Sequence, residues 1–483
     1  MKKILTMTVA LAGAVTLFAG EFMAGYAKTD ITPPLGVYMP GYYKSRFAKK
    51  VLDPMEVVCI ALSDGKNKAV VMQLDTEALS DFVAEDMIDA VVKATGLDRN
   101  AIILHASHTH DGGNLAIWSK LGEESEETRK QRPMDDIYRR MSITRVADAA
   151  VNAIANLKPA KMSYQRTVAK RITFGRRYLM KDGKVRTNPG VNNPDIVKPY
   201  GPPPDEEVQV LRIDCEGDKP ICVINFQTHP DVVGDETLTA DWPGLTRTVF
   251  EAATFGRTRC IVLNGTQGDV NHVNVMPRPG ERNGLKRDFD DVDRGYDHAW
   301  HMANVLAGSA LSVWMKCIPL EAGEVRFAKQ EVRVPANKAK DSDEKNLEWA
   351  KKVWAVHKAG KTNELPWKGM ELTTEVARAG RIIRMSRHGD FHDLPLWGVS
   401  IGKSVVFGAF PGEPFNDIGK QVKKNSPFTL TLLTCLTNGS RGYFPFSDAY
   451  KTGGYESATS PFGPSVADDL IAGQLKLMNS LYK

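Results

Sequence analysis

The sequence predicts an α/β fold in which helices flank a mixed sheet. The first observation is an alternation: strand-like apolar runs at 69–74 and 101–106 flank an amphipathic helix at 82–95, which is the pattern of a β-α-β crossover. The second is composition, because 483 residues with 42% hydrophobic and 25% charged side chains have ordinary globular proportions. Since no repeat or low-complexity linker divides the sequence, we expect residues 24–483 to form one domain.

Residues 1–20 have the pattern of a secretory signal peptide. Two lysines precede the apolar run at 4–19, which ends in small residues and is short for a membrane span. We therefore expect a secreted or periplasmic protein without stable membrane insertion once this segment is removed.

The remaining elements follow from apolar runs and from helical spacing of apolar residues. Strands are expected at 57–61, 161–173, 208–213, 221–226, 259–263, 324–334, 396–410 and 428–433, with 208–226 forming a hairpin. Helices are expected at 136–157, 243–254, 295–315, 342–358 and 371–385, and from 465 onward. Residues 175–204 are rich in Gly, Pro and Asn, which predicts a long surface loop.

Charge and cysteine content narrow the class of protein. The net charge of +5 is small for this length and is dispersed, so nucleic acid is not an expected partner. Among six cysteines, Cys215 and Cys222 bracket the turn of the predicted hairpin and are close enough in sequence for a disulfide. The alternative is that they are free thiols, as we expect for the other four, which lie in apolar surroundings.

Polar clusters follow several apolar strands. His108 and His110 are spaced i and i+2, which in extended backbone directs both imidazoles to one side; His229, the segment 264–269 and Glu413 also follow strands. Ligands of α/β proteins gather beyond strand ends, and two imidazoles with a carboxylate are the donor set of a catalytic zinc.

Each of these residues also has a simpler interpretation. His229 would satisfy a loop carbonyl, and Glu413 would cap a helix that starts at Pro414. The remaining histidines are expected to be structural or rim residues (His272, His298 and His301) or solvated (His357, His388 and His392).

The sequence resembles the neutral/alkaline ceramidase family. The resemblance rests on GYAKTDITPP, SHTHDGG, FQTHPDVVGDETLTADWPG, NGTQGDVNHVN, FGAFPGEPF and RGYFPFSDAYKTGGYESATSPFGP, which occur in the family's order. It implies a zinc amidohydrolase catalytic domain and a lipid substrate. The family's carboxy-terminal immunoglobulin-like domain is not expected in this chain.

The resemblance also implies roles for individual residues. The Zn²⁺ ligands would be His108, His229, Glu413 and Tyr443, although Tyr443 by itself looks like a packed loop aromatic. The catalytic residues would be His110, facing substrate or water, Arg176, holding the scissile group, and Tyr455, lining the pocket or bonding to the reacting carbonyl.

One motif departs from the family. Where the family has GDVSPN, this chain has GDVNHVN, with Asn271 in place of a serine that is proposed to act in catalysis and His272 in place of the proline. A mechanism through metal-activated water survives this change, and Asn271 would donate a hydrogen bond to an oxyanion.

Three functions therefore remain open. The leading one is an exported zinc-dependent hydrolase that cleaves a ceramide-like N-acyl amide by metal-activated water. The alternative is a lyase, deacetylase or esterase acting on an acidic or acylated polysaccharide, which the basic segment 171–186 (with Arg176, Arg177, Lys181 and Lys184) would contact if it is not simply a solvated surface. The third is a metal-containing binding protein without catalysis.

Overall fold

The computed structural model describes residues 21–42, 45–117, 126, 130, 132–278, 281, 286–287, 293–338 and 344–483. The predicted signal peptide at 1–20 lies outside the described residues. None of the helices in these ranges is long and apolar enough to cross a membrane.

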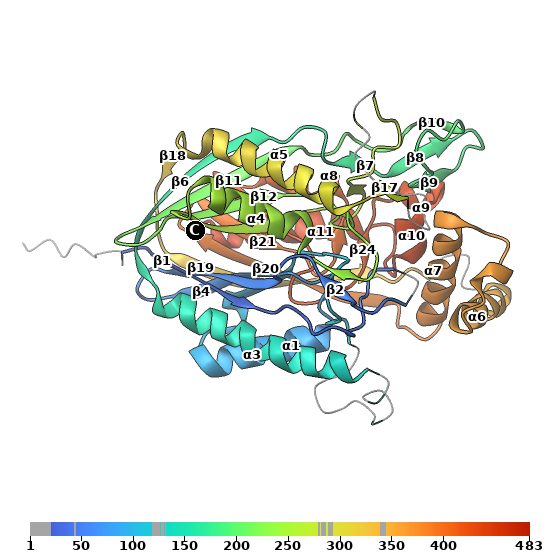
Figure 1. Ribbon diagram of the computed structural model, residues 1–483, viewed down its shortest axis with the longest axis horizontal. Helices are drawn as coiled ribbons and strands as arrows, with labels where there is room; N and C mark the ends of the chain where they lie inside the picture. Colours follow the sequence, from blue (N-terminus) through green and yellow to red (C-terminus); the bar gives the residue numbers. More distant parts are fainter. Residues whose placement is uncertain are drawn as a thin grey trace, which may run out of the picture.

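Two sheets pack face to face, and helices cover their outer faces (Figure 1). The larger sheet has nine strands: in spatial order β14 (Arg259–Asn264), β12 (Ile221–Phe226), β11 (Glu207–Cys215), β6 (Lys158–Val168), β1 (Met23–Asp30), β3 (Glu56–Ser63), β4 (Lys68–Leu74) and β5 (Ile102–Ala106), with β18 (Ile318–Leu320) beside β6. The smaller sheet has β19 (Val325–Pro335), β20 (Phe391–Ile401), β21 (Val405–Ala409) and β23 (Leu430–Thr434).

Most of the long helices pack on the outer faces of the two sheets. Those that pack on a sheet are α1 (Asp81–Thr95) and α3 (Pro133–Ala155) on the β1, β3 and β4 side, α4 (Asp241–Ala253) and α5 (Tyr296–Trp314) on the β11, β12 and β14 side, and α8 (Asn416–Asn425) and α11 (Val466–Leu481) on the smaller sheet. The others are α6 (Glu344–Lys358), α7 (Gly369–Met385), α9 (Ala449–Thr452) and α10 (Tyr455–Thr459). This arrangement confirms the mixed α/β fold.

The strand pairing confirms two predictions made from local sequence patterns and contradicts a third. β4 and β5 are parallel with α1 between them, as a β-α-β crossover requires, and β11 and β12 form the expected hairpin. The segment 396–410 was predicted as one strand, and this is wrong: it contains the end of β20 and all of β21, antiparallel strands that turn at Gly402, whose φ of 54° suits glycine.

A further prediction, a long surface loop at 175–204, is wrong. Residues 175–204 contain a three-stranded sheet, β10 (Ile196–Pro199), β8 (Arg177–Met180) and β9 (Val185–Thr187), because a few apolar residues there are buried. Of the two interpretations left open for Cys215 and Cys222, the structure supports free thiols, because the register places Cys222 opposite Arg212 and Cys215 opposite Ala160.

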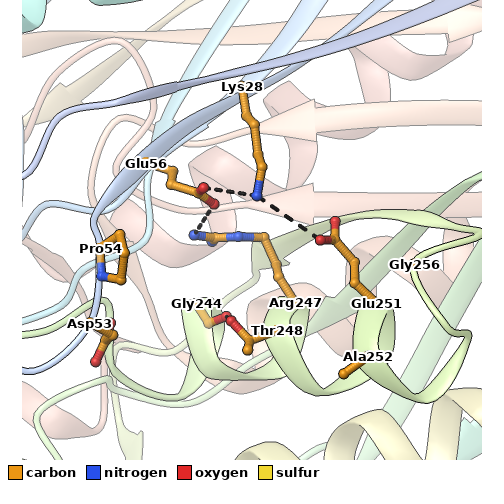
Figure 2. A pocket seen from close by; sticks show the side chains of 10 residues that line it. All are labelled: Lys28, Asp53, Pro54, Glu56, Gly244, Arg247, Thr248, Glu251, Ala252 and Gly256. Carbon is orange, nitrogen blue, oxygen red and sulfur yellow. Dashed lines mark hydrogen bonds and ion pairs between the residues drawn. The ribbon is translucent and has the colours of Figure 1, made fainter.

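Buried charge fixes α4 to the larger sheet (Figure 2). Arg247 of α4 donates from Nη1 to Asp75 Oδ1 at 3.0 Å and lies 3.5 Å from Glu56 of β3, which also pairs with Lys28 of β1 at 2.8 Å. These groups border a surface cavity of about 440 Å³. The start of α4 is thereby held close to the strand ends described below.

Helix α3 approaches β1 closely at Gly25, where a Cβ would lie 2.1 Å from the carbonyl oxygen of Ala153. We expect Gly25→Ala to lower the free energy of unfolding by about 1–3 kcal/mol, the usual cost of overpacking. Gly308→Ala in α5 is the matched control, since its methyl would meet open space and should stabilise the helix by up to about 1 kcal/mol. Equilibrium denaturation measures both, and an equally stable Gly25→Ala variant would contradict the close packing.

Candidate metal centre

The carboxyl ends of strands from both sheets meet at one edge. The amide of Cys435, after β23, donates to Asn264 at the end of β14, and the amide of Asn438 donates to Leu104 of β5. The polar residues that follow these strands are thus brought together, as expected from the strand ends: His108 and His110 after β5, His229 after β12, Gln267 after β14 and Glu413 after β21. Tyr443, which only the family resemblance had indicated, follows β23 and joins them.

The two histidines of the HxH motif lie in a turn. β5 ends at Ala106, and His108 has a φ of 75°, which a residue with a side chain adopts only when its surroundings hold it there. Its amide donates to Thr76 O at 2.9 Å, and the amide of His110 donates to Pro230 O at the same distance. The expected extended backbone is therefore wrong, although both imidazoles face the same centre.

Three imidazoles and a carboxylate converge on this centre. Glu413 Oε2 lies 3.1 Å from His229 Nε2 and 3.4 Å from His108 Nε2, and His110 Nε2 lies 3.2 Å from His108 Nε2. Ligand atoms of the three histidines all lie within 4.8 Å of one another, a grouping that could hold a metal ion. The Tyr443 hydroxyl lies 3.5 Å from His229 Nε2.

Backbone carbonyls fix the tautomers of two of these imidazoles. His108 Nδ1 lies 2.8 Å from Glu77 O, and His229 Nδ1 lies 2.8 Å from Gln267 O. Because a carbonyl only accepts hydrogen bonds, each Nδ1 carries a proton, and each ring directs its Nε2 into the centre, with a free lone pair when the ring is neutral. His229 thus satisfies a loop carbonyl and also points into the site, so its two interpretations are compatible.

The electrostatics of the centre favour a positive charge within it. Burial alone raises the pKa of Glu413, but His108 and His229 hold it well below its usual range. Burial lowers the pKa of His108, yet the Glu413 carboxylate raises it to about 9, whereas burial and Arg176 lower the pKa of His229 to about 4. A proton on His108 would balance Glu413, and so would a cation bound between the rings.

A short parallel pair brings Glu413 and Tyr443 side by side. β22 (Glu413–Pro414) pairs with β24 (Tyr443–Phe444), with Glu413 opposite Tyr443. The Tyr443 ring stacks on His229 with centroids 6.4 Å apart. The helix-cap interpretation of Glu413 is wrong, because α8 starts only at Asn416.

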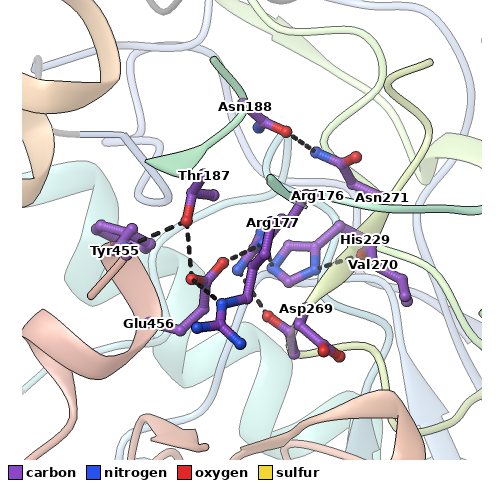
Figure 3. Close-up of polar contacts among 12 residues, drawn as sticks. Arg176, Arg177, Thr187, Asn188, His229, Asp269, Val270, Asn271, Tyr455 and Glu456 are labelled. Atoms are coloured by element: carbon purple, nitrogen blue, oxygen red, sulfur yellow. Dashed lines mark hydrogen bonds and ion pairs between the residues drawn. The ribbon is translucent and has the colours of Figure 1, made fainter. Parts of the chain in front are cut away.

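Arg176 lies beside His229 at the edge of the centre (Figure 3). Its Nη1 lies 3.1 Å from His229 Nε2, and its Nε donates to Glu456 at 2.6 Å. Arg176 and Arg177 are buried, so a solvated basic surface is the wrong interpretation for them, whereas Lys181 and Lys184 are exposed. Sequence reasoning missed Glu456, although two adjacent arginines in one loop call for a carboxylate once they are buried.

The other predicted residues lie around this group. Tyr455 packs edge-on against Tyr443, with ring centroids 5.7 Å apart. Asn271 is buried in β15 (Val270–Asn271), which pairs with β7 (Phe174–Gly175); its Nδ2 donates to Asn188 Oδ1 at 3.2 Å and its Oδ1 accepts from Val273 N at 3.1 Å. The side-chain hydrogen bonds of Asn271 therefore run to its neighbouring loops.

The remaining histidines are outside the centre. His272 is buried with Nδ1 3.1 Å from Asp231 Oδ1, and His298 packs beside it with ring centroids 5.3 Å apart, which fits a structural role. His388 is exposed as expected, but His392 is half-buried with Nε2 3.2 Å from Pro461 O.

Gly268 tests how closely the loop after β14 holds Glu413. A Cβ at this position would lie 2.5 Å from Glu413 O, so Gly268→Ala should displace the carboxylate and weaken any metal binding at this centre by about tenfold or more, as changes around metal ligands do. Gly175→Ala is the matched control, since nothing lies within 4 Å of its Cβ. Competition titration against a chromophoric chelator measures both; equal Zn²⁺ affinities would contradict this packing.

Comparison with solved structures identifies the architecture. A neutral ceramidase from Pseudomonas aeruginosa is similar, with a TM-score of 0.69 and 13% sequence identity over 96% of this chain and 74% of that one. A ceramidase complexed with C2 gives a TM-score of 0.67 and 13% identity over 95% and 75% of the two chains. No protein-family model and no curated protein sequence matches the chain significantly. The protein therefore has the fold of the neutral ceramidases.

Proposed function

We propose that this protein is a zinc-dependent hydrolase that cleaves an N-acyl amide of the ceramide type. The observation that carries the proposal is the convergence of His108, His229 and Glu413 within a neutral ceramidase fold. The pattern of residues 1–20 supports export as part of the same proposal.

The residues present fit a zinc ion. The proposed ligands His108, His229, Glu413 and Tyr443 offer nitrogen and oxygen without sulfur, which is typical of catalytic rather than structural zinc. Zinc, when bound, polarises a carbonyl and lowers the pKa of water to near neutrality.

The other side chains would bind and orient the amide. Arg176 Nη1 points into the centre and would donate to the carbonyl oxygen as negative charge develops there. Asn271 has a second amide N–H that would donate to the same oxygen. Tyr455 would line the pocket beside Tyr443.

His110 is suited to face substrate or water. Burial, and then the neighbouring His108, lower its pKa well below the usual range, so its imidazole is neutral. Its Nδ1 is buried and has no hydrogen-bond partner among the described residues. A neutral imidazole with an uncommitted nitrogen would hold water or a substrate group by a hydrogen bond.

Removal of metal should abolish turnover. We expect the purified protein to release fatty acid from a fluorescent short-chain ceramide, and to lose this activity on chelation and in His108→Ala. His388→Ala is the control, because that histidine is exposed and outside the centre. Activity that survives both chelation and His108→Ala would overturn the metal mechanism. Cleavage of acidic or N-acetylated polysaccharide without release of fatty acid would overturn the substrate.

His110 and Tyr443 should differ in their effects on the metal. We expect His110→Ala to keep Zn²⁺ and lose turnover, because His110 faces the substrate. Tyr443→Phe should weaken Zn²⁺ binding by at least about tenfold, since even residues outside the first coordination shell contribute that much. Measuring zinc content and kcat on both variants checks these two roles. Loss of zinc in His110→Ala, with zinc retained in Tyr443→Phe, would make His110 the ligand and Tyr443 the residue that faces substrate.

A further inference from the structure

A fully buried carboxylate, Glu456, lies behind the candidate metal centre (Figure 3). Its Oε1 accepts from Arg176 Nε at 2.6 Å, and its Oε2 accepts from the Thr187 hydroxyl at 2.8 Å. Arg177 Nε lies 3.9 Å from the same Oε2. Glu456 in α10 thus joins β9 and the segment that carries both arginines.

The contacts of Arg176 leave one edge of its guanidinium facing the centre. Nε is held by Glu456, and Nη2 donates to Gly268 O at 2.7 Å. Nη1 lies against the metal centre, 3.1 Å from His229 Nε2, and the guanidinium also interacts with Tyr443. The orientation of Arg176 is therefore set by its contacts with Glu456 and with the Gly268 carbonyl.

Glu456 also balances charge. Arg177 donates to Gly453 O at 3.1 Å and packs on the rings of Tyr200 and Phe415, all of which are neutral. Glu456 pairs with both buried arginines, and the carboxylate of Asp269 also interacts electrostatically with both. If Glu456 did not supply a negative charge, the guanidinium of Arg176 would repel a cation held by His229 and Glu413.

We propose that Glu456 is a positioning residue, which directs the Nη1 edge of Arg176 toward the substrate and offsets its charge beside the metal. The inference rests on the proposed function. The competing explanation is that Glu456 only links α10 to β9, and in that case its loss would lower stability without acting through Arg176.

A double-mutant cycle separates the two explanations. The variants are Glu456→Gln, Arg176→Ala and their combination, and the matched control is Asp195→Asn, which neutralises an exposed carboxylate of the nearby β8–β10 segment. Three measurements are made on each variant. They are the Zn²⁺ affinity by chelator competition, the thermal unfolding midpoint, and kcat and KM for a fluorescent short-chain ceramide.

We expect Glu456→Gln to weaken Zn²⁺ binding by about tenfold or more, and Arg176→Ala added to it to restore affinity to within about threefold of wild type. Glu456→Gln should lower kcat more than it raises KM, and should lower kcat no further in the Arg176→Ala background. Asp195→Asn should match the wild type.

Wild-type Zn²⁺ affinity in Glu456→Gln, or losses that multiply in the double variant, would overturn the positioning role and leave the proposed function standing. A wild-type protein that neither binds Zn²⁺ nor releases fatty acid would overturn the proposed function, and this inference with it.

Discussion

The protonation of His108 and His229 at Nδ1 is the constraint on which the site depends. Each Nδ1 is held by a backbone carbonyl, Glu77 O for one ring and Gln267 O for the other, so both Nε2 lone pairs turn toward Glu413. These carbonyls belong to segments that follow β4 and β14, and the imidazoles follow β5 and β12. The meeting of strand ends therefore places the Glu413 carboxylate and two imidazole nitrogens together, a set that favours a cation.

Paired buried charges hold the surroundings of this centre. Arg46 bonds to Asp111 at 3.0 Å and to the carbonyl oxygen of His110, which fixes the turn that carries both histidines of the HxH motif. Glu456 and Arg176 do the same on the opposite side. Buried charges are costly unless paired, so removing one partner costs much more than an exposed ion pair would.

The fold and part of the site could be read from local sequence patterns. Periodicity gave the β4–α1–β5 crossover, and residue type at strand ends singled out His108, His229 and Glu413. Tyr443 and Arg176 came only from family resemblance, because Tyr443 meets Glu413 through a short parallel pair that leaves no periodic signal. Glu456 was missed because a buried arginine and an exposed one look alike in sequence, and the same ambiguity led us to expect a solvated basic loop.

The central claim is that nitrogen and oxygen side chains at this strand edge hold one zinc ion. X-ray absorption at the zinc edge, on protein loaded with one equivalent of Zn²⁺, tests it most directly. The account predicts a nitrogen and oxygen shell at about 2.0–2.2 Å with imidazole scattering and no sulfur. A zinc–sulfur shell at about 2.3 Å would assign the metal to the free cysteines and contradict the account.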